Sequence, residues 1–312
     1  MKPLHKIKKS TKTLDETAML VRYNCSKWEG RRFDKDVTLA AEAQYKAHDA
    51  GRFNKSLLPR KCFKPIERAA GEAYTFHKEN TLPWGDKGER VLPAINYFDY
   101  TQGMNEKIQA FNSAVEAFIE GYGDAINEAK TSNLGSMFNA EDYPARADLA
   151  EKYSLTYKVT PIPTASDFRV PMEKTQLDEV LAKIEQGTSE DYKVALRDPW
   201  ERLYNEIAHM SERLGAYQKA PEVKLKKGEK RKRGAPKGGT RFNDGMIDSL
   251  IDLCDLLPKI NIGGDPELNR LAAEAKKKLT KFEGPELRTD NKKRDAVKKQ
   301  ADSILKDMGD FL

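Results

Sequence analysis

Two stretches of the chain carry apolar residues at alternating spacings of four and three. The first runs from Met104 to Tyr122 and the second from Leu196 to Tyr217. This spacing predicts a heptad seam on one face of a helix. Each seam corresponds to about 30 Å of helix at a rise of 1.5 Å per residue. Because the two stripes match in length, we predict that they pair as a long antiparallel, coiled-coil-like hairpin over residues 100–220.

The region between the seams, residues 131–188, differs from them in amino-acid composition. We predict that it forms a small module at the tip of the hairpin. Tyr153–Pro163 is rich in β-branched and aromatic residues, and Phe168–Pro171 also reads as extended. We expect these two segments to form a two-stranded ribbon. A helix is expected to follow at Leu177–Ile184.

Residues 13–99 are predicted to form an N-terminal helical region. We expect a short helix at Asp15–Val21 and a second at Val37–Ala50, where alanine and other strong helix formers are frequent. Pro65 is suited to the first turn of a third helix. Two prolines and two glycines in Thr81–Pro93 predict a loop.

Residues 242–312 are predicted to form a helical C-terminal unit, so the fold class is mainly α. Met246–Leu257 places its apolar residues on one helical face, and helices are also expected at Leu268–Phe282 and Asn291–Met308. No apolar run approaches the ~18 residues that span a bilayer.

Charge is distributed unevenly along the chain. The 55 basic and 49 acidic residues give a net charge of +6. Residues 219–241, here called the basic segment, carry a net +8; residues 276–299 carry +6 and residues 1–12 carry +5. The rest of the chain is therefore an acidic body with a net charge of −13. Such asymmetry favours contact with a polyanion.

The three cationic regions have different interpretations. Residues 1–12 are predicted to be a disordered basic tail. Acidic residues interleave in 276–299, which favours an ordinary solvated helix surface there. The basic segment has few opposing charges, and its prolines and glycines predict a flexible linker over 221–241. We therefore predict that it binds nucleic acid, DNA more readily than RNA, through nine cationic side chains: Lys224, Lys226, Lys227, Lys230, Arg231, Lys232, Arg233, Lys237 and Arg241.

Part of the basic segment, Lys230–Gly239, resembles an AT-hook, a short motif that enters the minor groove of A·T-rich DNA. The core of that motif is Arg-Gly-Arg-Pro, with both arginines in the narrow groove. Here Ala235 stands where the second arginine would be. Phosphate contact is therefore expected instead of groove insertion, and affinity should fall steeply with salt.

The sequence predicts neither an enzyme active site nor a cofactor or metal site. The zinc, P-loop, dinucleotide and nucleophile-elbow templates are all absent. Asp248, Asp252 and Asp255 share one helical face and leave a metal-dependent nuclease as a less favoured alternative. An ordinary solvated face is the favoured interpretation. Three widely spaced cysteines indicate a reducing compartment.

Several segments, in order along the chain, resemble a family of uncharacterised helical proteins encoded by bacteriophages and bacterial mobile elements. They are Trp28–Arg32, Leu58–Arg68, the helix 104–130, Phe168–Val170 and Arg241–Pro258. Genes of that family tend to lie beside those of MoxR-like ring ATPases and von Willebrand A-type proteins. The resemblance implies a phage or mobile-element accessory role in the host bacterial cytoplasm. It does not cover residues 222–239.

Two hypotheses follow from these patterns. In the first, the protein is a non-enzymatic phage accessory protein that binds nucleic acid early in infection, in replication, recombination or transcription. In the second, it is an adaptor or regulatory subunit of a MoxR-like ring ATPase and acts by protein–protein contacts, with a von Willebrand A-type protein as another possible partner. No membrane partner is expected.

Overall fold

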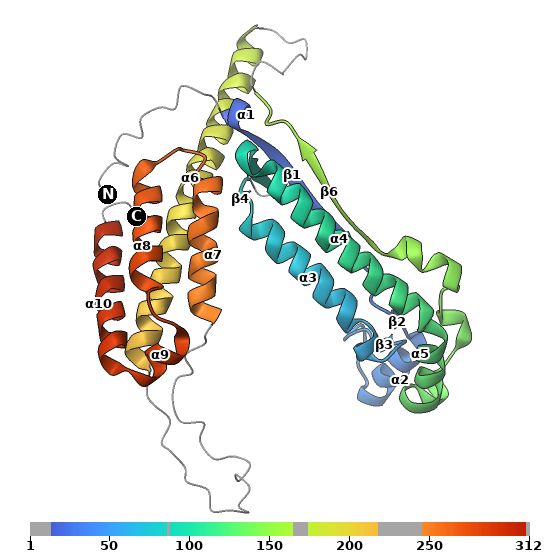
Figure 1. Ribbon diagram of the computed structural model, residues 1–312. Helices are drawn as coiled ribbons and strands as arrows, with labels where there is room; N and C mark the ends of the chain where they lie inside the picture. The colour runs from blue at the N-terminus through green and yellow to red at the C-terminus, as the bar shows by residue number, and fades with distance from the viewer. Residues whose placement is uncertain (1–13, 86–87, 165–173, 218–244, 310–312) are drawn as a thin grey trace, which may run out of the picture. The chain divides into compact units, whose positions relative to one another are not determined.

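The computed structural model describes residues 14–85, 88–164, 174–217 and 245–309, and this part of the chain is mostly helical with a small antiparallel sheet (Figure 1). The chain folds into two compact units. Unit 1 contains Met1–Leu20, Asn80–Asn96 and Thr160–Leu312, and unit 2 contains Val21–Glu79 and Tyr97–Val159. Each unit is therefore assembled from segments that are distant in sequence.

Unit 2 is built around the packing of α3 (Lys64–Glu79) against α4 (Tyr97–Glu120). Pro65 lies in the first turn of α3, as predicted. Gly103 lets the two helices approach closely, because a Cβ atom at this position would lie 2.2 Å from Cζ of Phe76 on α3. The first seam is buried on α4 through Met104, Phe111 and other members, and α5 (Tyr122–Glu128) follows.

Shorter elements complete unit 2. Helix α2 (Lys35–Tyr45) begins where the Asp34 carboxylate accepts a hydrogen bond from the Val37 amide, a standard N-cap. Strands β2 (Arg31–Phe33) and β3 (Asn54–Ser56) form an antiparallel pair on either side of α2 in sequence. A short 3-10 turn at Arg60–Cys62 precedes α3. One π turn and four further 3-10 turns lie between α5 and the next strand: Ala129–Asn133, Gly135–Met137, Ala140–Asp142, Arg146–Asp148 and Ala150–Lys152.

Unit 1 is a helical bundle in which the long α6 (Lys174–Ala216) packs against α10 (Asn291–Met308) and α7 (Gly245–Ile260), while α8 (Pro266–Leu279) packs against α7 and α10. The short α9 (Gly284–Thr289) joins α8 to α10 (Figure 1). The second seam is buried in this bundle through residues that include Leu203, Ile207 and Met210. The bounds predicted for the last helix are confirmed.

The sheet has the order β4–β5–β1–β6. Its strands are β4 (Leu82–Pro83), β5 (Glu89–Pro93), β1 (Ala18–Ser26) and β6 (Ser154–Thr160). The helix predicted at Asp15–Val21 is wrong beyond α1 (Leu14–Thr17), because the chain turns into β1 at Ala18. The predicted loop at 81–93 contains β4 and β5, and a 3-10 turn at Ala94–Asn96 follows.

The predicted pairing of the two seams is not confirmed. Helix α4 packs on α3 within unit 2, and α6 packs on α10 and α7 within unit 1. The strand expected within 153–163 is present as β6, but its neighbour in the sheet is β1. The second ribbon segment at 168–171 lies outside the described residues, as do the tail 1–12 and the linker 221–241.

Candidate nucleic-acid interface

All nine cationic residues predicted to bind nucleic acid lie within 218–244, outside the described residues. The structure does show where this segment is attached. Helix α6 ends at Ala216 and α7 begins at Gly245, and both ends lie at the same end of the unit 1 bundle, beside α9 (Figure 1). This end of the bundle, here called the anchor end, is therefore the place from which the basic segment departs.

The last described residue before the basic segment is held by aromatic and cationic packing. The Tyr217 ring lies under the Arg294 guanidinium, with Cζ of Arg294 4.8 Å from the ring centroid. Arg294 is buried and donates hydrogen bonds to the Leu287 carbonyl (3.0 Å) and to Oδ1 of Asn291 (2.7 Å). A cation held over an aromatic face in this way is stabilised by the ring quadrupole. The chain thus leaves the bundle from a fixed point.

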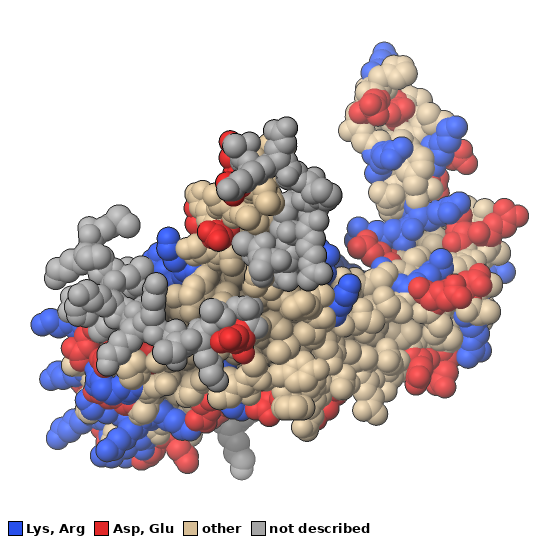
Figure 2. Space-filling model, turned by 90° about the horizontal axis from the view of Figure 1, so that it is seen from above, with Lys and Arg blue, Asp and Glu red and all other residues tan. Residues whose placement is uncertain are grey.

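Residues 276–299 run from the end of α8 into α10, and several of their lysines form ion pairs with carboxylates. Four lysines pair with carboxylates of the same unit: Lys276 with Asp255 (2.5 Å), Lys278 with Glu274 (2.5 Å), Lys293 with Glu286 (2.5 Å) and Lys298 with Asp302 (2.8 Å). Where charged side chains are visible in Figure 2, cationic and anionic groups lie next to one another. These pairs agree with the solvated-surface interpretation of this segment.

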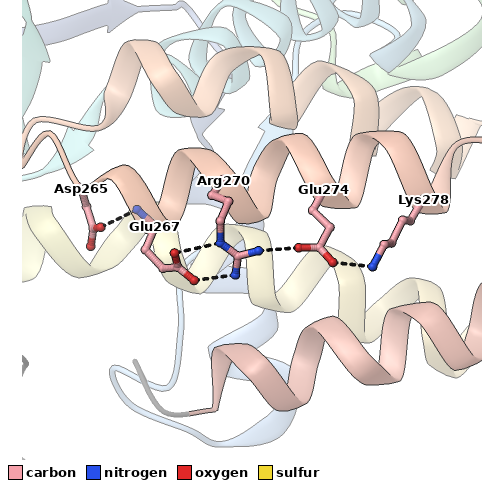
Figure 3. A network of polar contacts seen from close by, with 5 residues as sticks. All are labelled: Asp265, Glu267, Arg270, Glu274 and Lys278. Carbon is pink, nitrogen blue, oxygen red and sulfur yellow. Dashed lines mark hydrogen bonds and ion pairs between the residues drawn. The ribbon is translucent and has the colours of Figure 1, made fainter.

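Helix α8 carries a connected chain of such contacts (Figure 3). Asp265 caps the helix by accepting from the Glu267 amide at 2.9 Å. Arg270 then bridges Glu267 (2.5 Å) and Glu274 (2.7 Å), and Glu274 also accepts from Lys278. The guanidinium holds the pKa of the Glu267 carboxyl below its usual value. Opposite charges three and four residues apart on an exposed helix face stabilise the helix itself.

The acidic face proposed for a metal-dependent nuclease is not assembled as a metal site. Asp255 is occupied by Lys276, while Asp248 and Asp252 lie exposed on α7. Within the described ranges, no three His, Cys, Asp or Glu side chains converge in a way that could hold a metal ion. No helix within these ranges is both long enough and apolar enough to cross a bilayer.

Unit 2 also contains a nearly buried charged cluster that no pattern in the sequence predicts. Nζ of Lys55 on β3 forms ion pairs with Oδ2 of Asp142 (2.7 Å) and Oδ2 of Asp34 (3.2 Å), and it donates a hydrogen bond to the Met137 carbonyl (3.1 Å). The contact with Asp142 raises the pKa of the Lys55 ammonium. The amide of Val37, followed by Lys55, lowers the pKa of Asp34. The ammonium contacts oxygen atoms of three residues, so this cluster joins three segments of unit 2.

Comparison with known proteins finds no matching protein family, no matching curated protein and no matching solved structure.

Proposed function

We propose that the protein binds nucleic acid, with DNA as the expected form, through the basic segment, and that it serves as a non-enzymatic phage accessory protein early in infection. The observation that carries this proposal is the net charge of +8 within residues 219–241, in a chain whose remaining body is acidic. Phosphate neutralisation by lysine and arginine releases condensed counterions and drives such binding without base contacts.

The ion pairs of the described residues support the choice of this segment over residues 276–299. Four cations of the latter are already paired with carboxylates of unit 1. Asp248, in the first turn of α7, and Asp252, one turn further along, are exposed and form no ion pair with any described residue. Even if both of these carboxylates paired with the basic segment, most of its ten cations would remain available to phosphate.

The test is binding to a DNA duplex by a variant that neutralises the densest run of charge, K230Q/R231Q/K232Q/R233Q. The matched control removes four exposed lysines elsewhere, K64Q/K152Q/K158Q/K183Q, none of which forms an ion pair within the described ranges. Both variants lower the net charge equally, so a difference between them reports on position.

We expect the first variant to bind at least about tenfold more weakly at low salt, because each phosphate contact contributes to affinity there. The control should retain most of its affinity. Equal losses of DNA affinity in the two variants would mean that the effect depends only on net charge. An unchanged affinity in the first variant would mean that the basic segment does not contact DNA. No binding by the wild-type protein at low salt would end the proposal itself.

A further inference from the structure

Strands β2 and β3 present an open face that combines arginine with an exposed aromatic ring. Arg31 pairs with Ser56 and Phe33 with Asn54 across the ladder. Because side chains alternate across a strand, these four residues share one face. Lys55, on the opposite face, is buried in its cluster with Asp34 and Asp142.

Phe33 and Arg52 form a stack on this part of unit 2. Cζ of Arg52 lies 4.9 Å from the centroid of the Phe33 ring, and the Phe33 side chain is 41% exposed. Arg52 is exposed as well, and it makes no ion pair within the described residues. A guanidinium that lies over an aromatic ring adds positive charge next to an exposed apolar surface, and both groups can stack on a base.

Two carboxylates of this part of unit 2, Asp34 and Asp142, are paired with Lys55. Asp34 caps α2 and pairs with Lys55, and Asp142 pairs with Lys55 and lies 3.6 Å from Nε of Arg32. Arg31 is exposed, and like Arg52 it pairs with no described carboxylate. The open face therefore carries two arginines that pair with no described carboxylate, together with an exposed aromatic ring.

We propose that Phe33, Arg52 and Arg31, here called the stacking platform, bind one unpaired base and its phosphate in single-stranded nucleic acid. The base would stack on the Arg52–Phe33 pair, and the Arg31 guanidinium would contact the adjoining phosphate. A duplex cannot use this surface in the same way, because its bases are already stacked on one another. The inference rests on the proposed function, since both require that the protein bind nucleic acid.

The test compares Phe33→Ala with Phe98→Ala, a control that removes another exposed ring of unit 2, 79% exposed on α4. The probes are an oligothymidine of about 12 nucleotides, within the span of single-strand sites, and a duplex of mixed sequence. Loss of one stacked base should weaken oligothymidine binding about tenfold. Duplex binding should stay unchanged, Phe98→Ala should match the wild type, and Phe33→Trp should restore affinity.

Each other outcome has a separate meaning. If the wild-type protein binds neither probe, the proposed function fails and the stacking platform fails with it. If it binds both probes but Phe33→Ala has no selective effect on oligothymidine, only the stacking platform is overturned, and K230Q/R231Q/K232Q/R233Q still tests the basic segment. Binding of polyglutamate that is lost in Phe33→Ala, with oligothymidine binding intact, would assign the surface to acidic protein segments and overturn the inference.

Photocrosslinking gives a second measurement that does not depend on affinity. An oligonucleotide that contains 5-iodouracil should crosslink to the peptide that includes Phe33 when the base stacks on it. Crosslinks confined to other peptides of the full-length protein would contradict the stacking platform, even if oligothymidine binds well.

Discussion

At the scale of single residues, Lys55 is a nearly buried cation held by three polar contacts. Its side chain is 9% exposed, and each of the two carboxylates that it contacts is 12% exposed. A buried cluster of this kind stabilises a fold only while every member keeps its partner. The cluster therefore holds β3, the N-cap of α2 and the turn at 137–142 together.

Lys55→Met should destabilise unit 2, and the size of the effect should depend on pH. The lowered pKa of Asp34 means that its contribution is present above its ordinary value of 3.8 and is lost as the pH falls through the folded value. Because the pKa of Lys55 is raised, its contribution to the stability of the fold is present below pH 10.5, its ordinary pKa, and is lost only as the pH rises above that value. The difference in the free energy of unfolding between wild type and variant should therefore be largest near neutral pH.

Urea unfolding over a series from about pH 2 to about pH 7, followed by circular dichroism, measures this difference. Lys64→Met is the control, because Lys64 is exposed and forms no ion pair within the described ranges. A gap between wild type and Lys55→Met that is as large in acid as at neutral pH would contradict the assignment of the stability to ionised Asp34.

At the scale of elements, the contact between α3 and α4 depends on Gly103. Gly103→Ala would gain up to about 1 kcal/mol of helix propensity. The added methyl group would overlap the Phe76 ring, and overpacking costs about 1–3 kcal/mol. We expect a net destabilisation of about 1 kcal/mol, measured by urea unfolding.

Gly71→Ala on α3 is the matched control, because nothing lies within 4 Å of a Cβ atom at that position. It should stabilise the protein slightly through helix propensity alone. If both substitutions were stabilising, the close approach of α3 and α4 at Gly103 would be wrong.

The charge network on α8 should contribute modestly and in a salt-dependent way. Arg270 is 53% exposed and bridges two carboxylates, so solvent screens both pairs. Arg270→Gln should lower the melting temperature at low ionic strength, and the difference should shrink at about 1 M salt, where the Debye length is ~3 Å. Thermal unfolding at the two salt concentrations measures it, and a loss that is independent of salt would point to side-chain packing instead.

The sequence predicts single elements of this fold better than their partners. Apolar periodicity predicts α10, whose predicted and observed bounds agree, and in the structure Asp290 caps its N-terminus. The two seams correctly mark buried helix faces, but a stripe of apolar residues does not specify which helix covers it. Strand β1 was missed because Ala18–Leu20 also suits a helix, and its strand neighbour β6 lies more than a hundred residues away.

The same limit applies to the candidate sites. The basic segment is visible in the sequence because its charges are consecutive. The stacking platform is not, because Phe33 and Arg52 are brought together only when β2 and β3 pair around α2. The Lys55 cluster likewise joins residues from three separate segments, and no spacing rule connects them.

At the scale of the whole molecule, the account depends on where positive charge remains available. The net charge of +6 conceals an acidic body of −13 and three cationic segments. One of these, 276–299, has several of its lysines engaged with carboxylates of unit 1. The basic segment and the stacking platform would then make two different contributions to the free energy of nucleic-acid binding, one electrostatic and one from base stacking.

The salt dependence of DNA binding tests the central claim most directly. If the basic segment neutralises about six to eight phosphates, the logarithm of the association constant should fall with the logarithm of salt concentration with a slope of roughly −5 to −7 on duplex DNA. The K230Q/R231Q/K232Q/R233Q variant should show a slope shallower by about 3 to 4. A slope near zero for the wild type, or one that the variant leaves unchanged, would contradict the account.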